Sequence, residues 1–329
     1  MAAASVVRVL DPYAEPRLRR SLADLATSVL PYLALLVAMY FALRLSIVLT
    51  LLLAVPTAGF MIRTFIVFHD CAHGSFLRTK RGNELLGAVV GVLVWLPFRS
   101  WRHEHAVHHA TSGDLDRRGV GDITTLTIAE YLERPWWSRL GYRLFRNPIV
   151  MFGFGWLLVL VLKPRFVPRS ARPRIRNSIL GTDLALALVI AGLWYAVGWR
   201  DLVLVLAPVL VIAGAAGIWL FYVQHQFEDA YWQTNESWRY DDAALQGSSY
   251  LKLPRVLQFF TGNIGFHHVH HLSARIPNYN LQIAHDQNEQ LQAVPQLSIR
   301  DGLRATRLKL WDEQQGRLVG FREAHAHAD

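Results

Sequence analysis

Four long stretches without a charged residue dominate this 329-residue chain. They cover residues 25–43, 45–62, 184–199 and 202–224. The hydrocarbon core of a bilayer is about 30 Å thick, so a helix of roughly 20 apolar residues crosses it. Only helices and closed barrels satisfy every backbone polar group inside lipid. We therefore predict an all-α integral membrane protein with four transmembrane helices, arranged as two tight hairpins.

Two further apolar runs, residues 85–98 and 148–162, are shorter. A helix of that length does not comfortably cross a bilayer, so we expect both runs to lie along the membrane interface or to re-enter. Residues 226–329 are more polar, and we expect them to form a helical cap. Residues 1–329 then make a single domain.

The distribution of basic residues predicts how the hairpins are oriented. Arg78, Lys80 and Arg81 follow the first hairpin. Six more precede the second: Lys163, Arg165, Arg169, Arg172, Arg174 and Arg176. Positive charge gathers on the cytoplasmic side of membrane proteins. We therefore expect both termini and the cap to be cytoplasmic.

The net charge of +9 raises the question of nucleic acid. However, the chain has 11 tryptophans beside its apolar runs, and such aromatic residues are typical of a membrane interface. We expect no nucleic-acid partner.

The histidines of the sequence indicate a metal site. Eight of the fourteen lie in the groups HDCAH, HAVHH and HHVHH, with spacings of i, i+3 and i+4. These eight are His69, His73, His105, His108, His109, His267, His270 and His271. On a helix, residues at these spacings share one face. Imidazole binds iron, zinc and copper, and eight exceed the four to six ligands of one ion, so a two-metal site is predicted.

The remaining histidines are less informative. His225 ends the fourth apolar run and is a ninth candidate ligand, although a lone histidine there is often only an interfacial or hydrogen-bonded residue. His103 and His268 point away from the shared faces, so we exclude them as ligands. We expect three others to be solvated: His285, His325 and His327.

Longer motifs surround the histidines. They are HDCAHGSF at 69–76, WRHEHAVHHATSGDLD at 101–116, VQHQFEDAYW at 223–232, GSSYLKLP at 247–254 and FTGNIGFHHVHHLSARIPNYNL at 260–281. Together they resemble the membrane fatty acid desaturase superfamily, more narrowly the acyl-lipid omega-6 (delta-12) desaturases of cyanobacteria and plastids. The sequence departs from the family pattern at Ala72, where glycine is frequent, and at His268, which is an extra histidine.

The resemblance implies an enzyme that uses O2 to introduce a cis double bond into a fatty acyl chain. It implies two non-haem irons bound by the eight grouped histidines and His225. Histidine ligands need partners that fix their tautomers. Candidates for that role are Asp70, Glu104, Asp114, Asp116, Glu228 and Asp229. For Asp70 and Glu104, an ordinary solvated acid is an equally good interpretation.

The resemblance also implies partners and a location. The substrate is a membrane lipid or another acyl compound. The haem-module motif HPGG is absent from the sequence, so a separate protein supplies electrons. Ferredoxin is the donor expected for this subgroup, and a haem cytochrome is the alternative. We expect a multi-pass protein of a bacterial plasma membrane.

Other functions remain open. Within the same oxygenase class, the chain could be a hydroxylase, a ketolase or a sphingolipid desaturase. A metal transporter is a candidate of another class. Transport requires polar ligands near the middle of the spans, whereas the four apolar runs carry no charge and the histidines gather at one end. The sequence therefore favours an enzyme.

Overall fold

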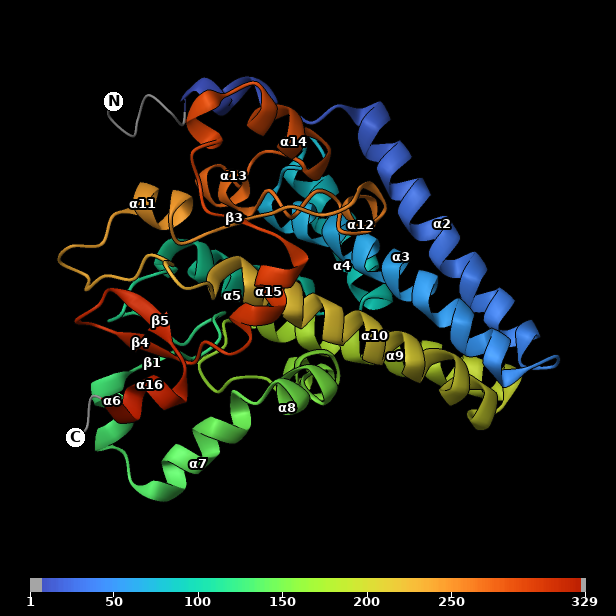
Figure 1. Cartoon of the computed structure of the whole chain (residues 1–329). Coiled ribbons are helices and arrows are strands. Elements are labelled where there is room, and N and C mark those ends of the chain that lie inside the picture. The colour runs from blue at the N-terminus through green and yellow to red at the C-terminus, as the bar shows by residue number, and fades with distance from the viewer. Residues whose placement is uncertain (1–7, 327–329) are drawn as a thin grey trace.

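Four long helices form the body of the protein. The computed structural model describes residues 8–326, with side chains described through residue 323. The long helices are α2 (Leu18–Ala42), α3 (Ile47–His73), α9 (Pro173–Val197) and α10 (Trp199–His225), and each is long and apolar enough to cross a membrane (Figure 1). This confirms the prediction of a helical fold with four membrane helices.

The helices extend beyond the apolar runs that predicted them. α3 continues past Ile62 to His73, a further rise of about 16 Å. The charged Arg63 lies within this continuous helix and forms an ion pair with Asp24 of α2. The last turns of α3 therefore carry His69 and His73 beyond the apolar span.

The helix ends make the hairpins tight. Ser46 caps α3 by accepting a hydrogen bond from the backbone nitrogen of Leu49. At the opposite end of α3, away from this turn, Gly74 ends the helix with a φ of 73°, a left-handed conformation that glycine adopts without steric cost. Gly198, with a φ of 82°, separates α9 from α10. Both membrane hairpins thus turn within a few residues.

The two shorter apolar runs are broken rather than continuous. The first contains the end of α4 (Lys80–Leu93) and the start of α5 (Phe98–Thr111), and the two helices are bent by 103°. The second contains α8 (Pro148–Gly153) and a π-helix at Leu157–Leu162, and a 3₁₀ turn at Lys163–Arg165 follows it. The bend between α4 and α5 directs the second histidine motif back toward α3.

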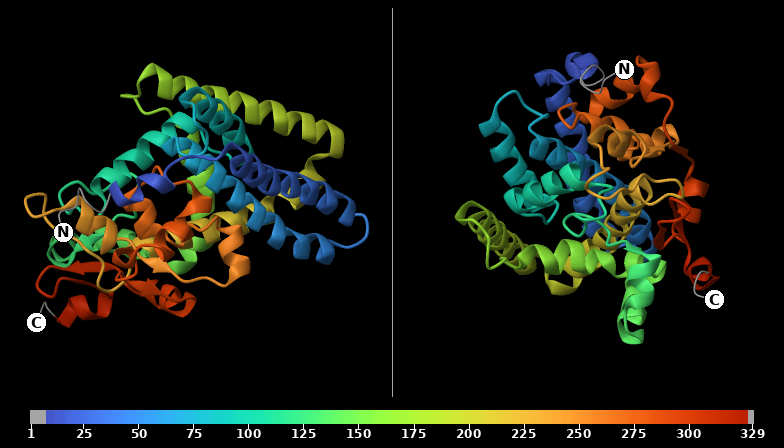
Figure 2. Two further views of the ribbon diagram at one scale, coloured as in Figure 1. Left: turned by 90° about the horizontal axis from the view of Figure 1, so that it is seen from above. Right: turned by 90° about the vertical axis from the view of Figure 1, so that its left-hand side faces the viewer.

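Helix α7 (Trp136–Phe145) exposes a large apolar face. Trp136 is 71% exposed and Trp137 is 64% exposed, and Leu140 and Leu144 lie beside them. Its inner face is anchored by Tyr142, whose hydroxyl donates to the backbone oxygen of Lys309 (2.6 Å). Figures 1 and 2 show α7 projecting from the body. Such a face is typical of a helix in the membrane interface, and the sequence analysis did not include this segment.

The cap is not wholly helical. Its helices are α11 (Tyr240–Leu245), α12 (Arg255–Phe260), α13 (His267–Leu272), α14 (Asn278–Asp286), α15 (Ile299–Ala305) and α16 (Phe321–Ala326). The structure adds short strands that the sequence analysis did not foresee. Strand β4 (Leu310–Asp312) pairs in parallel with β1 (Leu126–Thr127), next to helix α6 (Ile128–Glu133), and antiparallel with β5 (Arg317–Val319). Strand β2 (Tyr250–Leu251) pairs in parallel with β3 (Gln296–Leu297).

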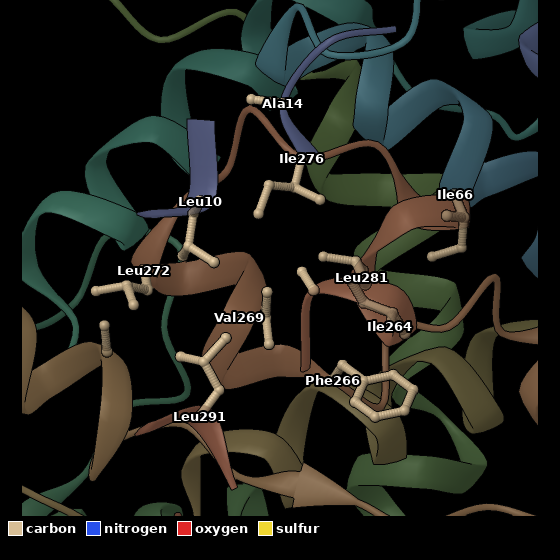
Figure 3. Close-up of a cluster of buried hydrophobic side chains, with 12 residues drawn as sticks. Leu10, Ala14, Ile66, Ile264, Phe266, Val269, Leu272, Ile276, Leu281 and Leu291 are labelled. Atoms are coloured by element: carbon tan, nitrogen blue, oxygen red, sulfur yellow. The ribbon is translucent and has the colours of Figure 1, made fainter. Parts of the chain in front are cut away.

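One face of α13 packs into an apolar cluster of the cap. Val269 and Leu272 of this helix lie among Leu10, Phe266 and Leu291 (Figure 3). All of these side chains are buried, so they fix the rotation of α13. His267, His270 and His271 of this helix consequently face the ends of α3 and α10.

Candidate metal site

The nine histidines proposed as ligands come together in two groups. The first group is His69, His73, His105, His109 and His270. The second group is His108, His225, His267 and His271. Within each group, one nitrogen of every residue lies within 4.8 Å of the others. Helices α3, α5, α10 and α13 supply them, so residues far apart in sequence converge on one place.

In the first group, the Nε2 atoms of neighbouring histidines lie close together. His105 Nε2 lies 3.0 Å from His69 Nε2 and 3.1 Å from His109 Nε2, and His270 Nε2 lies 3.0 Å from His109 Nε2. Two nitrogens about 2.1 Å from one ion are about 3.0 Å apart at a right angle, but about 3.4 Å apart at a tetrahedral angle. The spacing and the five donors both favour an octahedral ion over tetrahedral zinc.

The second group has similar spacing. His225 Nε2 lies 3.1 Å from His108 Nε2 and 2.9 Å from His267 Nε2. On its far side, His225 Nδ1 donates to the backbone oxygen of Gly247 (3.1 Å). This hydrogen bond keeps the proton on Nδ1 and leaves Nε2 free to bind a metal.

Each group also contains a nitrogen that the protein leaves unpaired. His73 Nε2 and His271 Nε2 are buried and have no hydrogen-bond partner among the described residues. A buried polar atom without a partner is unfavourable by about 1–3 kcal/mol. A metal ion in each group would satisfy both atoms, so the residues fit a pair of ions.

Burial keeps the histidines in the form that binds metal. Desolvation, followed by repulsion from neighbouring imidazoles, lowers the pKa of five of them well below the usual 6.5. These five are His105, His109, His267, His270 and His271. They are therefore neutral at physiological pH, and a neutral imidazole is the ligand state.

Two acidic residues contact the histidines directly. Asp70 Oδ1 lies 3.3 Å from His69 Nδ1, as the sequence analysis proposed. Asp122, which the sequence analysis missed, contacts His108 Nδ1. A Cβ at the preceding Gly121 would lie 2.9 Å from His108 Cβ, so only glycine lets this loop approach α5 so closely. The Gly-Asp pair is the only sequence signal for this contact, and it lies in a loop where helical spacing does not apply.

The other proposed partners of the histidines bond elsewhere. Glu104 forms an ion pair with Lys163 (2.7 Å) on the protein surface. Asp114 is fully buried, and it accepts hydrogen bonds from Arg117 and from the backbone nitrogen of Asp116. These hydrogen bonds stabilise the loop after α5.

Three acidic residues are exposed. Asp116 accepts a hydrogen bond from the backbone of Asn235 (2.8 Å), and Glu228 pairs with Arg317. Asp229 is exposed as well. The motifs place these acids near the histidines in sequence, but the chain turns them outward.

Two histidines outside the site form a pair of their own. His268 Nε2 lies 3.0 Å from His285 Nδ1, and both are buried. The prediction that His285 is solvated is therefore wrong, because α14 packs this residue against α13 and the ring of Tyr250. His103 is exposed. The predictions for His325 and His327 fall outside the described side chains.

Comparison with known proteins places this architecture in a family. The family model described as fatty acid desaturase matches residues 17–300. This chain belongs to the fatty acid desaturase family. It is 44% identical to a fatty acid desaturase of Bacillus subtilis over 310 residues, which are 94% of this chain and 88% of that protein.

More distant relatives carry more specific names. The sn-1 oleoyl-lipid 12-desaturase of Synechocystis sp. is 30% identical over 67% of this chain and 63% of that protein. The chloroplastic omega-6 fatty acid desaturase of Brassica napus is 27% identical over 67% of this chain and 49% of that protein. The chain thus spans less than two thirds of these two relatives.

A long cavity in this desaturase leads to the histidines. Its volume is about 380 Å³, and its walls come mainly from α3, α5, α10 and the π-helix. At one end it reaches His69 and His105 of the first group and His267 of the second. At the other end the lining includes Met61 and Ala213. A chain molecule in this cavity would lie beside both histidine groups.

Proposed function

We propose that this desaturase is an O2-dependent enzyme that introduces a cis double bond into a fatty acyl chain, with one non-haem iron in each histidine group. The observation that carries the proposal is that one apolar cavity meets histidines of both groups. An acyl chain is the substrate shape that suits such a cavity. A transporter would instead need ligands along its spans.

The reaction requires a strong oxidant, because no side chain removes hydrogen from an unactivated methylene. The iron pair with O2 supplies that oxidising power when bound. Two methylenes lose two hydrogen atoms to form the double bond, and these hydrogens, together with two electrons from the donor and two protons, reduce O2 to two waters. The protein holds the chain against the site, and its apolar walls exclude bulk water.

The position of the double bond is the finer part of the proposal. We assign the omega-6 (delta-12) position from the motifs and from the similarity to the cyanobacterial and plastid enzymes. The Bacillus relative, at 44% identity, has a name that specifies no position. The related alternatives are a hydroxylase, a ketolase and a sphingolipid desaturase, which share the histidine chemistry.

The fatty-acid profile of a host that expresses this chain with a competent reductase tests the proposal. We expect a new diene in which the added double bond lies at the omega-6 position. A His108→Ala variant in the same host is the inactive control. A hydroxylated product would support the alternative enzymes, and an unchanged profile with iron-loaded protein would refute desaturation.

We also propose where the electron donor binds. Arg169 and Arg172 are exposed before α9, and Arg174 and Arg176 are exposed in its first turn. Lys163 and Arg165, in contrast, pair with Glu104 and Asp183. These four arginines form no ion pair with any other described side chain, so their charges suit an acidic protein such as ferredoxin, and a haem cytochrome is the alternative. Surface charges are screened within about 10 Å at ordinary salt. Turnover should therefore fall as ionic strength rises, and a flat profile would contradict docking by charge.

The location is proposed from the same features. α3 and α10 both end at the histidines, so the two hairpins enter the membrane from one side. The basic residues mark that side as cytoplasmic. We propose a multi-pass protein of a bacterial plasma membrane, with both termini and the metal site in the cytoplasm.

A further inference from the structure

Gly217 of α10 lines the cavity without a structural need to be glycine. Its backbone is helical, and a Cβ added there would meet no heavy atom within 4 Å. Gly214, one turn earlier, differs because its Cβ would lie 2.3 Å from Trp156 Cβ. The other two glycines that line the cavity, Gly119 and Gly121, have positive φ angles. Packing or backbone geometry therefore explains the other three and leaves Gly217 unexplained.

Glycine inside a helix has a cost. Relative to alanine it destabilises a helix by about 0.5–1 kcal/mol. At Gly217 nothing in the packing offsets that cost, and the space in front of it belongs to the cavity. The missing side chain thus leaves the cavity open.

The depth of Gly217 follows from the helices. It lies eight residues before His225 on α10, and Met61 lies eight residues before His69 on α3. Both helices end at the metal site, so both positions are about 12 Å from it along the helix axes. Gly217 and Met61 line the cavity at one depth, with Ala213 further along.

The chemistry of the cavity orients an acyl chain. The polar groups of the lining include Lys163, Glu104 and Asp122. They lie at the histidine end of the cavity, where Asp122 contacts His108 and Lys163 pairs with Glu104. The part around Met61 and Ala213 is apolar. A lipid headgroup or carboxylate belongs at the polar end, so the methyl end of the chain extends past the histidines toward Gly217.

We propose that Gly217 determines how many carbons of the acyl chain fit between the metal site and the methyl end. This inference rests on the proposed function, because it requires the cavity to hold the substrate. A larger side chain would occupy the space that the methyl segment needs. The enzyme would then accept shorter chains, or place the double bond nearer the methyl end. Both changes reduce the number of carbons between the double bond and the methyl end.

The experiment compares Gly217→Leu and Gly217→Ala with the unmodified chain in a host supplied with acyl chains of several lengths. Mass spectrometry gives the number of carbons from each new double bond to the methyl end. For Gly217→Leu we expect the product ratio to shift at least tenfold toward smaller counts. For Gly217→Ala we expect a shift of about twofold in the same direction. Gly192→Leu on the exposed face of α9 is the matched control and should leave the ratio unchanged.

An unchanged ratio in Gly217→Leu overturns the inference. If that variant makes no product, Gly217→Ala decides, and an unchanged ratio there overturns it equally. Failure of the proposed function is distinguishable, because in that case the unmodified chain itself makes no double bond. If the unmodified protein is active and the Gly217 variants give the same product ratio, only the role of Gly217 is refuted.

Discussion

Asn278 at the start of α14 donates two hydrogen bonds to one oxygen of Asp70 in α3. The backbone nitrogen lies 2.7 Å and the side-chain nitrogen 3.0 Å from Asp70 Oδ2. The same side-chain nitrogen donates to Asp24 of α2 (2.8 Å). Because the other oxygen of Asp70 lies 3.3 Å from His69 Nδ1, one amide connects the cap and two membrane helices to the metal site.

Replacement of this amide should weaken metal binding. Asn278→Ala removes the side-chain hydrogen bonds to Asp70 and Asp24 and leaves Asp70 Oδ2 with the backbone nitrogen alone, so Asp70 is held less firmly beside His69. Loss of such an orienting partner typically lowers metal affinity about 10- to 100-fold. Metal retained during titration with a chelator measures the effect, and the exposed Asn235→Ala is the control. Equal retention by Asn278→Ala and the unmodified protein would contradict this role.

His73 offers a direct test of the first histidine group. Its Nε2 atom has no protein partner among the described residues, so an ion is its expected partner. His73→Ala should reduce the iron content of the purified protein from about two ions toward one per chain, because the second group keeps all of its histidines. His103→Ala, at an exposed position, should leave the content unchanged. Full iron in both variants would remove His73 from the ligand set.

Asp122 should matter through the tautomer of His108. His108 Nε2 faces His225, so its proton must sit on Nδ1, where Asp122 accepts it. Asp122→Asn can instead donate to Nδ1 and move the proton to Nε2. We expect activity to fall about 10- to 100-fold, as for other orienting partners of metal ligands. Asp116→Asn, at an exposed acid, is the control, and equal activity of the two variants would argue against this role.

Local periodicity explains why the sequence was informative about the histidines. The spacing i, i+3, i+4 depends on one helix alone, so it identified eight of the nine residues that converge in the structure, and His225 was added from its place at the end of the fourth apolar run. The division into groups was not predictable. His108 joins the residues of α10 and α13 while its neighbour His109 joins those of α3, and that depends on how the helices cross.

Contacts between distant segments account for what the sequence analysis missed. Asp122 reaches His108 because a glycine lets its loop pass over α5, and His285 is buried because α14 packs on α13. The charge of Arg63 predicted the end of a membrane span there, but α3 continues through Arg63, which is paired with Asp24 of another helix. The spacing of residues within one segment does not predict contacts with partners from other segments.

Lys309 should make stability depend on pH. Burial, with the nearby Arg146, lowers the pKa of its ammonium from 10.5 to about 7. Between these values the unfolded chain binds a proton that the folded chain does not, so stability rises as the pH increases from about 7 toward 10.5 and is unaffected by this group below 7.

Thermal unfolding in detergent at pH 7, 8 and 9 checks the effect of Lys309. The unfolding temperature of the unmodified protein should gain more from higher pH than that of Lys309→Met. The exposed Lys252→Met should behave like the unmodified protein. Identical pH slopes in all three proteins would show that Lys309 does not titrate in this range.

The metal site should lie on the cytoplasmic side of the membrane. The bent pair of α4 and α5 could be a broken span by length and composition. A crossing would place His105 about 30 Å of hydrocarbon away from His69, whereas their Nε2 atoms are 3.0 Å apart. The pair must therefore return to the side where α3 ends, and positive charge indicates that this side is cytoplasmic.

Single cysteines test this topology in a Cys71→Ser background, which removes the one native cysteine. Ser46→Cys lies in the exposed turn between α2 and α3, and an impermeant thiol reagent should label it from outside intact cells. Ser170→Cys and Ser237→Cys are exposed on the other side of the spans and should react only after the membrane is permeabilised. Labelling of either of these two in intact cells would invert the proposed orientation, because both segments lie on the side that carries the histidines and the basic residues.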